Sequence, residues 1–133
     1  MNIVGNGVDI VENVRIKKSL KLKGFVNRIF TKNEINKSLK LTNKTNYFAK
    51  RFAAKEAFVK ALGLGFRNNI NFNDIEIYNN KKGSPKIKIS QKIKDILKKK
   101  FKIKNYDIHL SLSDEKNHSI AFVILNRKKW KTL

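Results

Sequence analysis

The sequence that decides the fold reads Arg51-Phe52-Ala53-Ala54-Lys55-Glu56-Ala57-Phe58-Val59-Lys60-Ala61-Leu62-Gly63. This stretch is typical of an α-helix. At 3.6 residues per turn, one face combines small side chains with two charges, namely Ala49, Ala53, Glu56, Ala57 and Lys60. Small side chains let a neighbouring backbone or a ligand come close, so a carboxylate there needs a cation, a metal ion or a hydrogen-bond donor. An ordinary ion pair between Glu56 and Lys60 is the alternative that the helix alone leaves open.

The N-terminal run 3–11 is short and mostly apolar with two glycines, which indicates a buried strand. Asp9 lies in its apolar end, where an Asp is either the N-cap of a following helix or a metal ligand. Together with Glu56 it supplies two hard oxygen ligands. Mg²⁺ takes one or two carboxylates and completes its shell with water and substrate phosphates. The pair therefore predicts a magnesium site, and three nearby cations could serve phosphate oxygens, namely Arg51, Lys55 and Lys60.

Composition narrows the class of protein. A chain of 133 residues forms one domain with a modest core, and without cysteine it has neither disulfides nor a Cys-based zinc site. No run approaches the roughly 20 apolar residues of a membrane span, and no signal peptide is recognisable. We therefore expect a cytoplasmic protein that is not inserted in a membrane.

The formal net charge of +21 predicts attraction to anionic partners. Only five of the 31 basic residues are arginine, the better side chain for base and bidentate phosphate contacts. A nucleic-acid-binding module is thus favoured by charge alone, and Phe48, Phe52 and Phe58 are better explained as helix core than as a stacking platform. A purely structural scaffold would leave Asp9 and Glu56 unexplained.

The hydrophobic pattern predicts a single mixed domain. Helices are expected over residues 11–20, 25–30, 47–62 and 91–101, and strands over 3–11, 74–78, 86–89, 106–113 and 119–125. Thr31 and Glu34 form a capping box, and Gly63 is placed as a left-handed C-cap. The strand 119–125 is apolar on both faces and should be central. Alternation along 106–113 puts His109, Ser111 and Ser113 on one face, but without a nucleophile elbow this arrangement does not favour a hydrolase.

Taken together, these motifs resemble the holo-acyl-carrier-protein synthases, the small 4′-phosphopantetheinyl transferases of bacterial fatty-acid synthesis. The resemblance covers nearly the whole chain and is carried by residues 7–10, 25–34, 51–65, 83–85 and 109–114 in this order. It implies an α+β fold of one domain over residues 1–133. In that fold an N-terminal strand and helices precede a largely antiparallel sheet with one further helix.

The resemblance also implies a reaction. Coenzyme A donates its 4′-phosphopantetheine arm to a serine of apo acyl carrier protein and releases adenosine 3′,5′-bisphosphate. The implied catalytic residues are Asp9, Glu56 and Lys60, with Mg²⁺ held by the two carboxylates. The residues implied to bind coenzyme A are Arg51, Lys55, Lys60, Gly63, Gly65, Pro85 and Ser113. Many relatives carry histidine at position 114, where this chain has Asp114, so that residue is not expected to contact phosphate as a histidine would.

Two kinds of partner follow from the same resemblance. The acidic acyl carrier protein is expected to dock on basic residues of the early helical region, namely Arg15, Lys18, Lys21, Lys23 and Arg28. A homotrimer with active sites shared between subunits is also expected. Residues 120–125 support it indirectly, because a small domain has few layers to cover both faces of an apolar strand.

Overall fold

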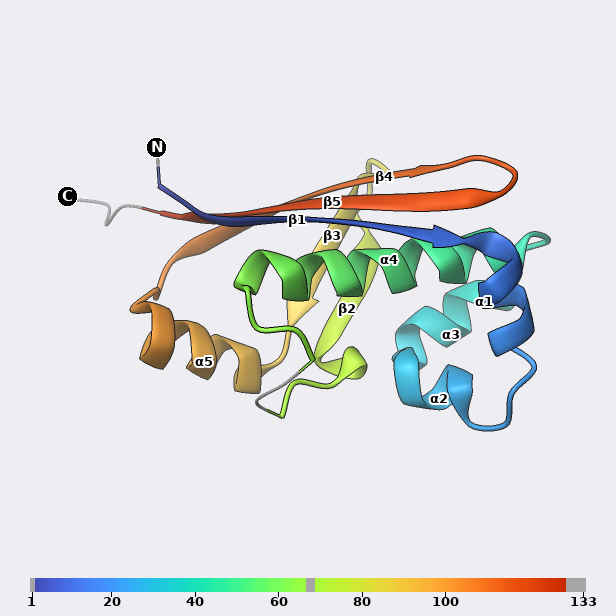
Figure 1. Ribbon diagram of the computed structural model, residues 1–133, viewed down its shortest axis with the longest axis horizontal. Coiled ribbons are helices and arrows are strands. Elements are labelled where there is room, and N and C mark those ends of the chain that lie inside the picture. The colour runs from blue at the N-terminus through green and yellow to red at the C-terminus, as the bar shows by residue number, and fades with distance from the viewer. Residues whose placement is uncertain (1, 67–68, 129–133) are drawn as a thin grey trace.

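A three-stranded antiparallel sheet extends along one side of the molecule (Figure 1). Its central strand is β5 (His118–Arg127), flanked by β1 (Ile3–Glu12) and β4 (Tyr106–Asp114). The prediction that the apolar run 119–125 is a central strand is therefore confirmed. The computed structural model describes residues 2–66 and 69–128.

The long helix α4 (Lys44–Leu62) packs against the inner face of this sheet, along β1 and β5. Two glycines of β1 permit the contact: a Cβ on Gly7 would lie 1.9 Å from the carbonyl oxygen of Ala57, and one on Gly5 would lie 2.0 Å from that of Ala61. The small face predicted for the helix is therefore the face on which β1 lies. The helix begins three residues before the predicted start, because the side chain of Asn43 accepts a hydrogen bond from the Asn46 N–H.

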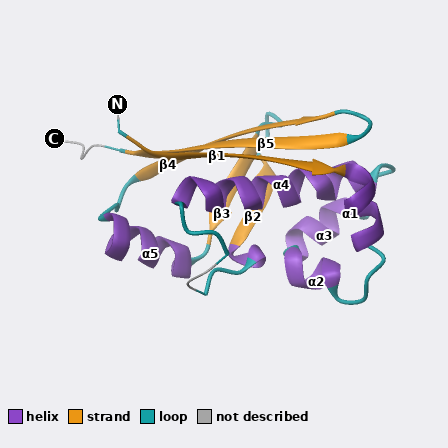
Figure 2. Ribbon diagram, viewed as in Figure 1, coloured by secondary structure: helices purple, strands orange, loops and turns teal. Residues whose placement is uncertain are grey.

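The other helices lie on the same side of the sheet as α4, and the β2–β3 hairpin rises from that side to the level of the sheet (Figure 2). Three short helices gather near the N-terminal end of α4, while α5 lies near its other end. The β2–β3 hairpin forms a separate two-stranded antiparallel sheet, so the predicted strands divide between two sheets. The bounds are α1 Asn13–Ser19, α2 Phe25–Ile29, α3 Lys32–Ser38, a 3-10 turn η1 Phe72–Asp74, β2 Ile75–Asn79, β3 Pro85–Ile89 and α5 Gln91–Phe101. The α+β fold class is confirmed.

Two hydrophobic clusters form the core. The larger one fills the space between the main sheet, α4, α5 and the hairpin, with Phe58, Ile93 and Leu97 at its centre. The smaller one is aromatic and joins α1 and α2 to the first half of α4, with Phe30 packed on Phe48 at a ring separation of 4.6 Å. The smaller cluster buries the first part of α4 and the larger cluster buries the rest, so together they fix the helix that carries the charged residues.

The outer face of the main sheet has no covering element among the described residues (Figure 1). Val8 pairs with Phe122 and Ile10 with Ile120 in the strand register, and these four side chains are between 38 and 58% exposed. The prediction that residues 3–11 form a buried strand is thus wrong in part: β1 is an edge strand whose outer side chains are exposed, and Gly7 is its one buried residue. The part of the outer face that β1 and β5 form is therefore apolar, whereas β4 presents Ser111 and Ser113 on the same face.

Candidate active site

Asp9, Glu56 and Lys60 meet where β1 crosses α4. The close packing of Gly7 on the helix brings Asp9, two residues further along the strand, beside the charged face of α4. The Lys60 ammonium donates to Asp9 Oδ1 at 3.0 Å and to the carbonyl oxygen of Val8 at 2.9 Å. Burial raises the pKa of Glu56, the negative charge of Asp9 raises it further, and Lys60 opposes both. The two predicted metal-binding carboxylates are therefore near enough to repel each other.

This group fits a hard divalent cation that shares its coordination with a substrate. The two carboxylates come from different elements, and their repulsion would be relieved by a cation between them. No cluster of three or more His, Cys, Asp or Glu side chains is found in residues 2–66 and 69–128. Mg²⁺ does not require one, because water and phosphate oxygens usually fill most of its shell. Asp9 and Glu56 are thus the residues that would hold the ion.

Arg51 lies in a different place, at the floor of a cleft of about 1240 Å³ between α3, the first half of α4, the β2–β3 hairpin and the end of β4. Its side chain is only 7% exposed. The guanidinium lies 3.7 Å above the centre of the Tyr47 ring, and its Nη2 donates to Asn79 Oδ1 at 2.8 Å. Burial lowers its pKa, although a guanidinium stays protonated in proteins. The cleft therefore has a cationic floor.

The cleft and the Asp9–Glu56–Lys60 group do not coincide within one chain. Arg51 and Glu56 are five residues apart, which at 3.6 residues per turn places them about 140° apart around the helix. Pro85 lines the cleft with Arg51, as predicted for a shared ligand site, and so does Asp114. The Asp114 carboxylate accepts a hydrogen bond from Asn46 at 2.8 Å and pairs with Lys50 at 3.6 Å, so it engages α4.

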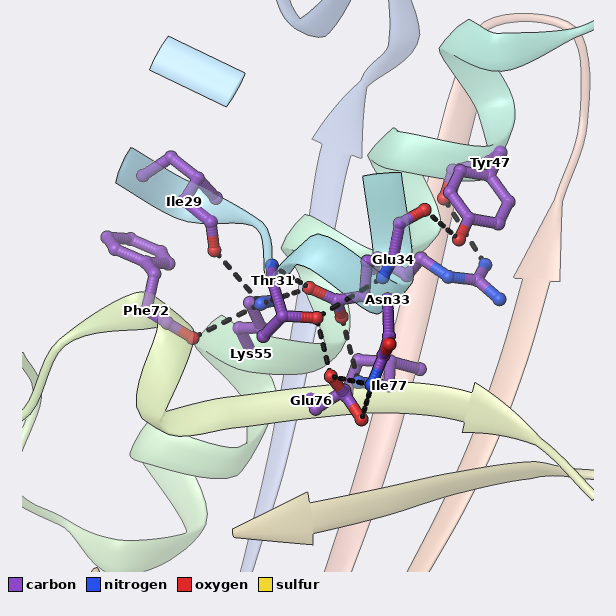
Figure 3. A network of polar contacts seen from close by, with 10 residues as sticks. Ile29, Thr31, Asn33, Glu34, Tyr47, Lys55, Phe72, Glu76 and Ile77 are labelled. Atoms are coloured by element: carbon purple, nitrogen blue, oxygen red, sulfur yellow. Dashed lines mark hydrogen bonds and ion pairs between the residues drawn. The ribbon is translucent and has the colours of Figure 1, made fainter. Parts of the chain in front are cut away.

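Lys55 contradicts the expectation that it contacts phosphate. Its side chain is fully buried, and its ammonium donates to Glu34 Oε1 at 2.7 Å and to the carbonyl oxygens of Ile29 at 2.9 Å and Phe72 at 3.2 Å (Figure 3). An ammonium has three N–H groups, so these acceptors use all of them. Lys55 is a structural residue in this fold.

The partner of Lys55 is the glutamate of the predicted capping box. Thr31 and Glu34 exchange the two bonds of that motif, which confirms the prediction. Glu34 also accepts from the Ile77 N–H at 2.8 Å, and the Thr31 hydroxyl donates to Glu76 at 2.6 Å (Figure 3). One buried carboxylate thus joins α3 to α4 and β2. The capping box was the sequence signal for the Thr31–Glu34 part of this network.

The other predicted residues are exposed. Gly63 and Gly65 have positive φ angles of 74° and 64° after the end of α4, and Gly63 is the predicted left-handed cap. Ser113 lies on the outer face of β4 opposite Ile120. The predicted docking residues are exposed on α1, the following turn and α2, and lie among exposed apolar side chains of Val14 and Leu22. These five are Arg15, Lys18, Lys21, Lys23 and Arg28.

Two alternative functions lose support from the structure. In the described part of the chain no hydrogen bond joins His109 to Ser111 or Ser113, so the arrangement lacks a nucleophile–base contact. Phe48 and Phe58 are buried in the core and are not available for stacking on bases.

No helix in residues 2–66 or 69–128 has the length and apolar character needed to cross a membrane.

The family is decided by comparison with known proteins. The family described as the 4′-phosphopantetheinyl transferase superfamily matches residues 5–123. The holo-[acyl-carrier-protein] synthase of Pelagibacter ubique is 55% identical over 128 residues, which is 96% of this chain and all of the relative. The chain belongs to the holo-acyl-carrier-protein synthase family.

Solved structures of this family share the fold. A holo-(acyl-carrier-protein) synthase from Bacillus anthracis in complex with CoA (3′,5′-ADP) has a TM-score of 0.80 and 37% identity, covering 96% of this chain and all of that one. The Helicobacter pylori holo-[acyl-carrier-protein] synthase in complex with coenzyme A has a TM-score of 0.77 and 30% identity, covering 91% of this chain and 99% of that one. The resemblance inferred from the motifs is confirmed.

Three supporting residues were not anticipated from the sequence. Tyr47 and Asn79 hold Arg51, as described above. Asn13 is buried at the start of α1, where its side chain donates to the backbone of Glu115 at 2.9 Å and accepts from the buried Ser119 hydroxyl at 2.7 Å. It thereby fixes the turn between β4 and β5. Asn and Tyr are common on surfaces, so their residue type alone does not indicate a supporting role. That role becomes visible only with partners that are distant in the sequence.

Proposed function

We propose that this chain is a holo-acyl-carrier-protein synthase, which moves the 4′-phosphopantetheine arm of coenzyme A to a serine of apo acyl carrier protein. The observation that carries the proposal is the Asp9–Glu56–Lys60 group, set in a fold that its family relatives share while binding coenzyme A. The serine oxygen forms a bond to the phosphorus that carries the arm. The bond from that phosphorus to the bridging pyrophosphate oxygen breaks, and the serine proton is lost. Adenosine 3′,5′-bisphosphate leaves.

Asp9 and Glu56 are the proposed ligands of Mg²⁺. When bound, the ion supplies charge neutralisation at the pyrophosphate. Lys60 is half-exposed and makes two contacts with β1, so its ammonium can turn from Asp9 to a pyrophosphate oxygen without leaving a buried charge unpaired. Its proposed role is a second cationic contact to the same group.

Coenzyme A binding is proposed to use the cleft as well. Arg51 supplies a guanidinium to a phosphate group, and Pro85 contributes to the wall. Gly63 and Gly65 lack side chains at the end of α4, so phosphate oxygens could approach their backbone N–H groups. Ser113 remains a proposed contact from the outer face of β4. Lys55 is not part of this proposal, because its donors are already used.

Acyl carrier protein is proposed to dock on α1 and α2. The five predicted basic residues are exposed there, which suits an acidic partner. Val14 and Leu22 are more than half exposed in the same region, so the surface can also bury apolar side chains of the partner. This combination of charge and apolar area favours a protein partner over a polyphosphate.

A homotrimer with shared active sites is proposed from the outer face of the main sheet. Val8, Ile10, Ile120 and Phe122 form an exposed apolar surface, and a neighbouring copy would remove it from water. In one chain, Arg51 and the Asp9–Glu56–Lys60 group lie on different sides of α4. In a shared site, Arg51 of one copy could lie beside the Asp9–Glu56–Lys60 group of the next copy. A cytoplasmic location and a role in fatty-acid biosynthesis belong to the same proposal.

One assay tests the reaction. Purified protein is mixed with coenzyme A, Mg²⁺ and apo acyl carrier protein, and the carrier is followed by mass spectrometry. We expect the mass to increase by one phosphopantetheine arm, and we expect a chelator to stop the increase until Mg²⁺ is restored. Folded protein that never modifies the carrier would overturn the proposed function.

A further inference from the structure

Arg51 is a buried cation without a carboxylate partner. None of the ion pairs among the described residues includes Arg51, and its Nε is buried without an acceptor. A buried charge is costly unless an opposite charge or several hydrogen bonds offset its lost hydration. The cleft that Arg51 lines also contains Lys37, Lys50 and Lys88, together with the carboxylates of Glu34, Glu76 and Asp114. Each of these carboxylates already has partners in the fold: Glu34 pairs with Lys55, Asp114 pairs with Lys50, and Glu76 accepts from Thr31 and Asn33. An incoming anion is therefore the group that would satisfy Arg51.

Tyr47 supports one side of this guanidinium. The ring lies 3.7 Å below the guanidinium carbon, and the backbone carbonyl of Tyr47 accepts from Nη1 at 3.5 Å. The ring itself is anchored, because its hydroxyl donates to the backbone carbonyl of Glu34 at 2.6 Å. The buried network around Glu34 therefore also fixes the surface on which Arg51 rests (Figure 3).

Asn79 holds the end of the same group. Its Oδ1 accepts from Arg51 Nη2 at 2.8 Å, and its Nδ2 donates to the carbonyl oxygen of Gly83 at 2.9 Å. The amide is thus fixed at both of its ends. Asn79 is also the register partner of Pro85, so the β2–β3 turn sets where the amide stands. Two elements far apart in the sequence determine one orientation of Arg51.

We infer that Tyr47 and Asn79 are positioning residues that hold Arg51 as a preformed receptor for one phosphate group of the nucleotide. This inference rests on the proposed function and adds to it the two residues that orient Arg51. The contacts to Tyr47 and Asn79 use one N–H of each Nη nitrogen, so one N–H on each remains for the ligand, since a guanidinium has five N–H groups in total. A group already held in its bound orientation loses little conformational entropy when the phosphate arrives. The ligand chemistry is a phosphate monoester on a nucleoside.

Binding of adenosine 3′,5′-bisphosphate tests the inference without transfer. Affinities are measured by calorimetry in Mg²⁺ buffer for the wild type and for Arg51→Ala, Asn79→Ala, Tyr47→Leu, Tyr47→Phe and the double variant Arg51→Ala/Asn79→Ala. Asn79 is exposed, so its variant should fold, and thermal unfolding checks each protein. Tyr47→Phe is the matched control, because it keeps the ring and loses only the hydroxyl.

We expect Arg51→Ala to weaken binding at least about tenfold, and Asn79→Ala and Tyr47→Leu each about fivefold. Tyr47→Phe should weaken binding less than Tyr47→Leu does, because the ring still lies under the guanidinium although its anchoring hydroxyl is lost. Asn79→Ala should add less than about twofold to Arg51→Ala, because it acts through the arginine. Repeating the series with adenosine 5′-monophosphate shows whether the 3′-phosphate or the 5′-phosphate is the one recognised.

The failures are distinguishable. Normal binding by Asn79→Ala and Tyr47→Leu, with weak binding by Arg51→Ala, would overturn the positioning role and leave the proposed function intact. An Asn79→Ala effect that persists undiminished in the Arg51→Ala background would also overturn it. Normal binding by Arg51→Ala would show that Arg51 does not receive the phosphate and would overturn the inference. The proposed function would still be tested separately by the mass increase of the carrier.

Discussion

Lys55 and Lys60 lie five residues apart on α4, and each pairs with a carboxylate from another element. Lys55 meets Glu34 at 2.7 Å with both side chains fully buried, whereas Lys60 meets Asp9 at 3.0 Å with side chains 54% and 14% exposed. The two pairs have the same chemistry and similar lengths. They differ in whether the protein supplies all the acceptors of the ammonium.

That difference separates a structural lysine from one available to a ligand. Lys55 has three protein acceptors, and moving it would leave Glu34 charged and buried. Lys60 has two, both on β1, and water can replace either one. Position in a sequence motif therefore does not separate the two lysines, whereas the count of acceptors that the protein supplies does.

The largest expected effect concerns the carboxylates beside Lys60. Asp9→Ala and Glu56→Ala should each lower the transfer rate by at least about 10³-fold, which corresponds to about 4 kcal/mol of transition-state stabilisation. The rate is measured by carrier modification over a Mg²⁺ titration, with circular dichroism to show that both variants fold. Full activity of either variant at limiting Mg²⁺ would contradict the assignment of the metal ligands.

Removing each lysine in turn sharpens the comparison. Lys55→Met should lower the free energy of unfolding by about 3–5 kcal/mol, because it leaves the Glu34 carboxylate buried without its cation. Lys60→Met should change it by less than about 1 kcal/mol, because an exposed ion pair contributes little. Urea unfolding measures both. Equal losses would show that the two pairs do not differ as described.

A smaller effect is expected from the docking surface. Changing Arg15 and Lys21 to Glu should raise the apparent KM for acyl carrier protein about tenfold and leave the KM for coenzyme A unchanged, since rim charges act on the encounter with the acidic partner. The matched control is Lys98→Glu/Lys99→Glu on α5, which changes the net charge equally on exposed residues elsewhere. Equal increases in both double variants would indicate a general charge effect and no defined docking surface.

The smallest effect is expected from assembly, because activity should fall only when the protein is diluted. If sites are shared between copies, activity per chain should fall as the wild type is diluted below its assembly constant, and Phe122→Lys on the outer face should lose activity at higher concentrations than the wild type does. Light scattering records the oligomeric state in parallel. A monomer with full activity would exclude a shared site.

The sequence predicts local structure in this chain better than pairing across the fold. The capping box at Thr31, the cap at Gly63 and the helix over residues 91–101 follow from local chemistry and are confirmed. Lys55 was assigned to a ligand because its partner Glu34 is 21 residues away, where periodicity gives no information. The open face of β1 was missed for a similar reason, since a short apolar run does not show whether one face or both will be covered.

The residues of the candidate site follow the same division. Asp9 and Glu56 could be paired from motif chemistry, and the structure places them close together. Tyr47 and Asn79 could not, because a tyrosine in a helix and an asparagine before a turn carry no signal of a shared arginine. Only the fold brings α4 and the β2–β3 hairpin to the same guanidinium.

Gly5 and Gly7 have no side chains, yet their positions set how closely β1 and α4 pack beside the candidate site. A methyl group at position 7 would start 1.9 Å from a backbone oxygen of α4, so strand and helix would have to separate by about 1 Å or more. Asp9 would move with the strand, whereas Glu56 and Lys60 would stay with the helix. An alanine at either glycine would therefore lower activity as the loss of a site residue would. The cause would be different, because the substitution changes only the distance between β1 and α4.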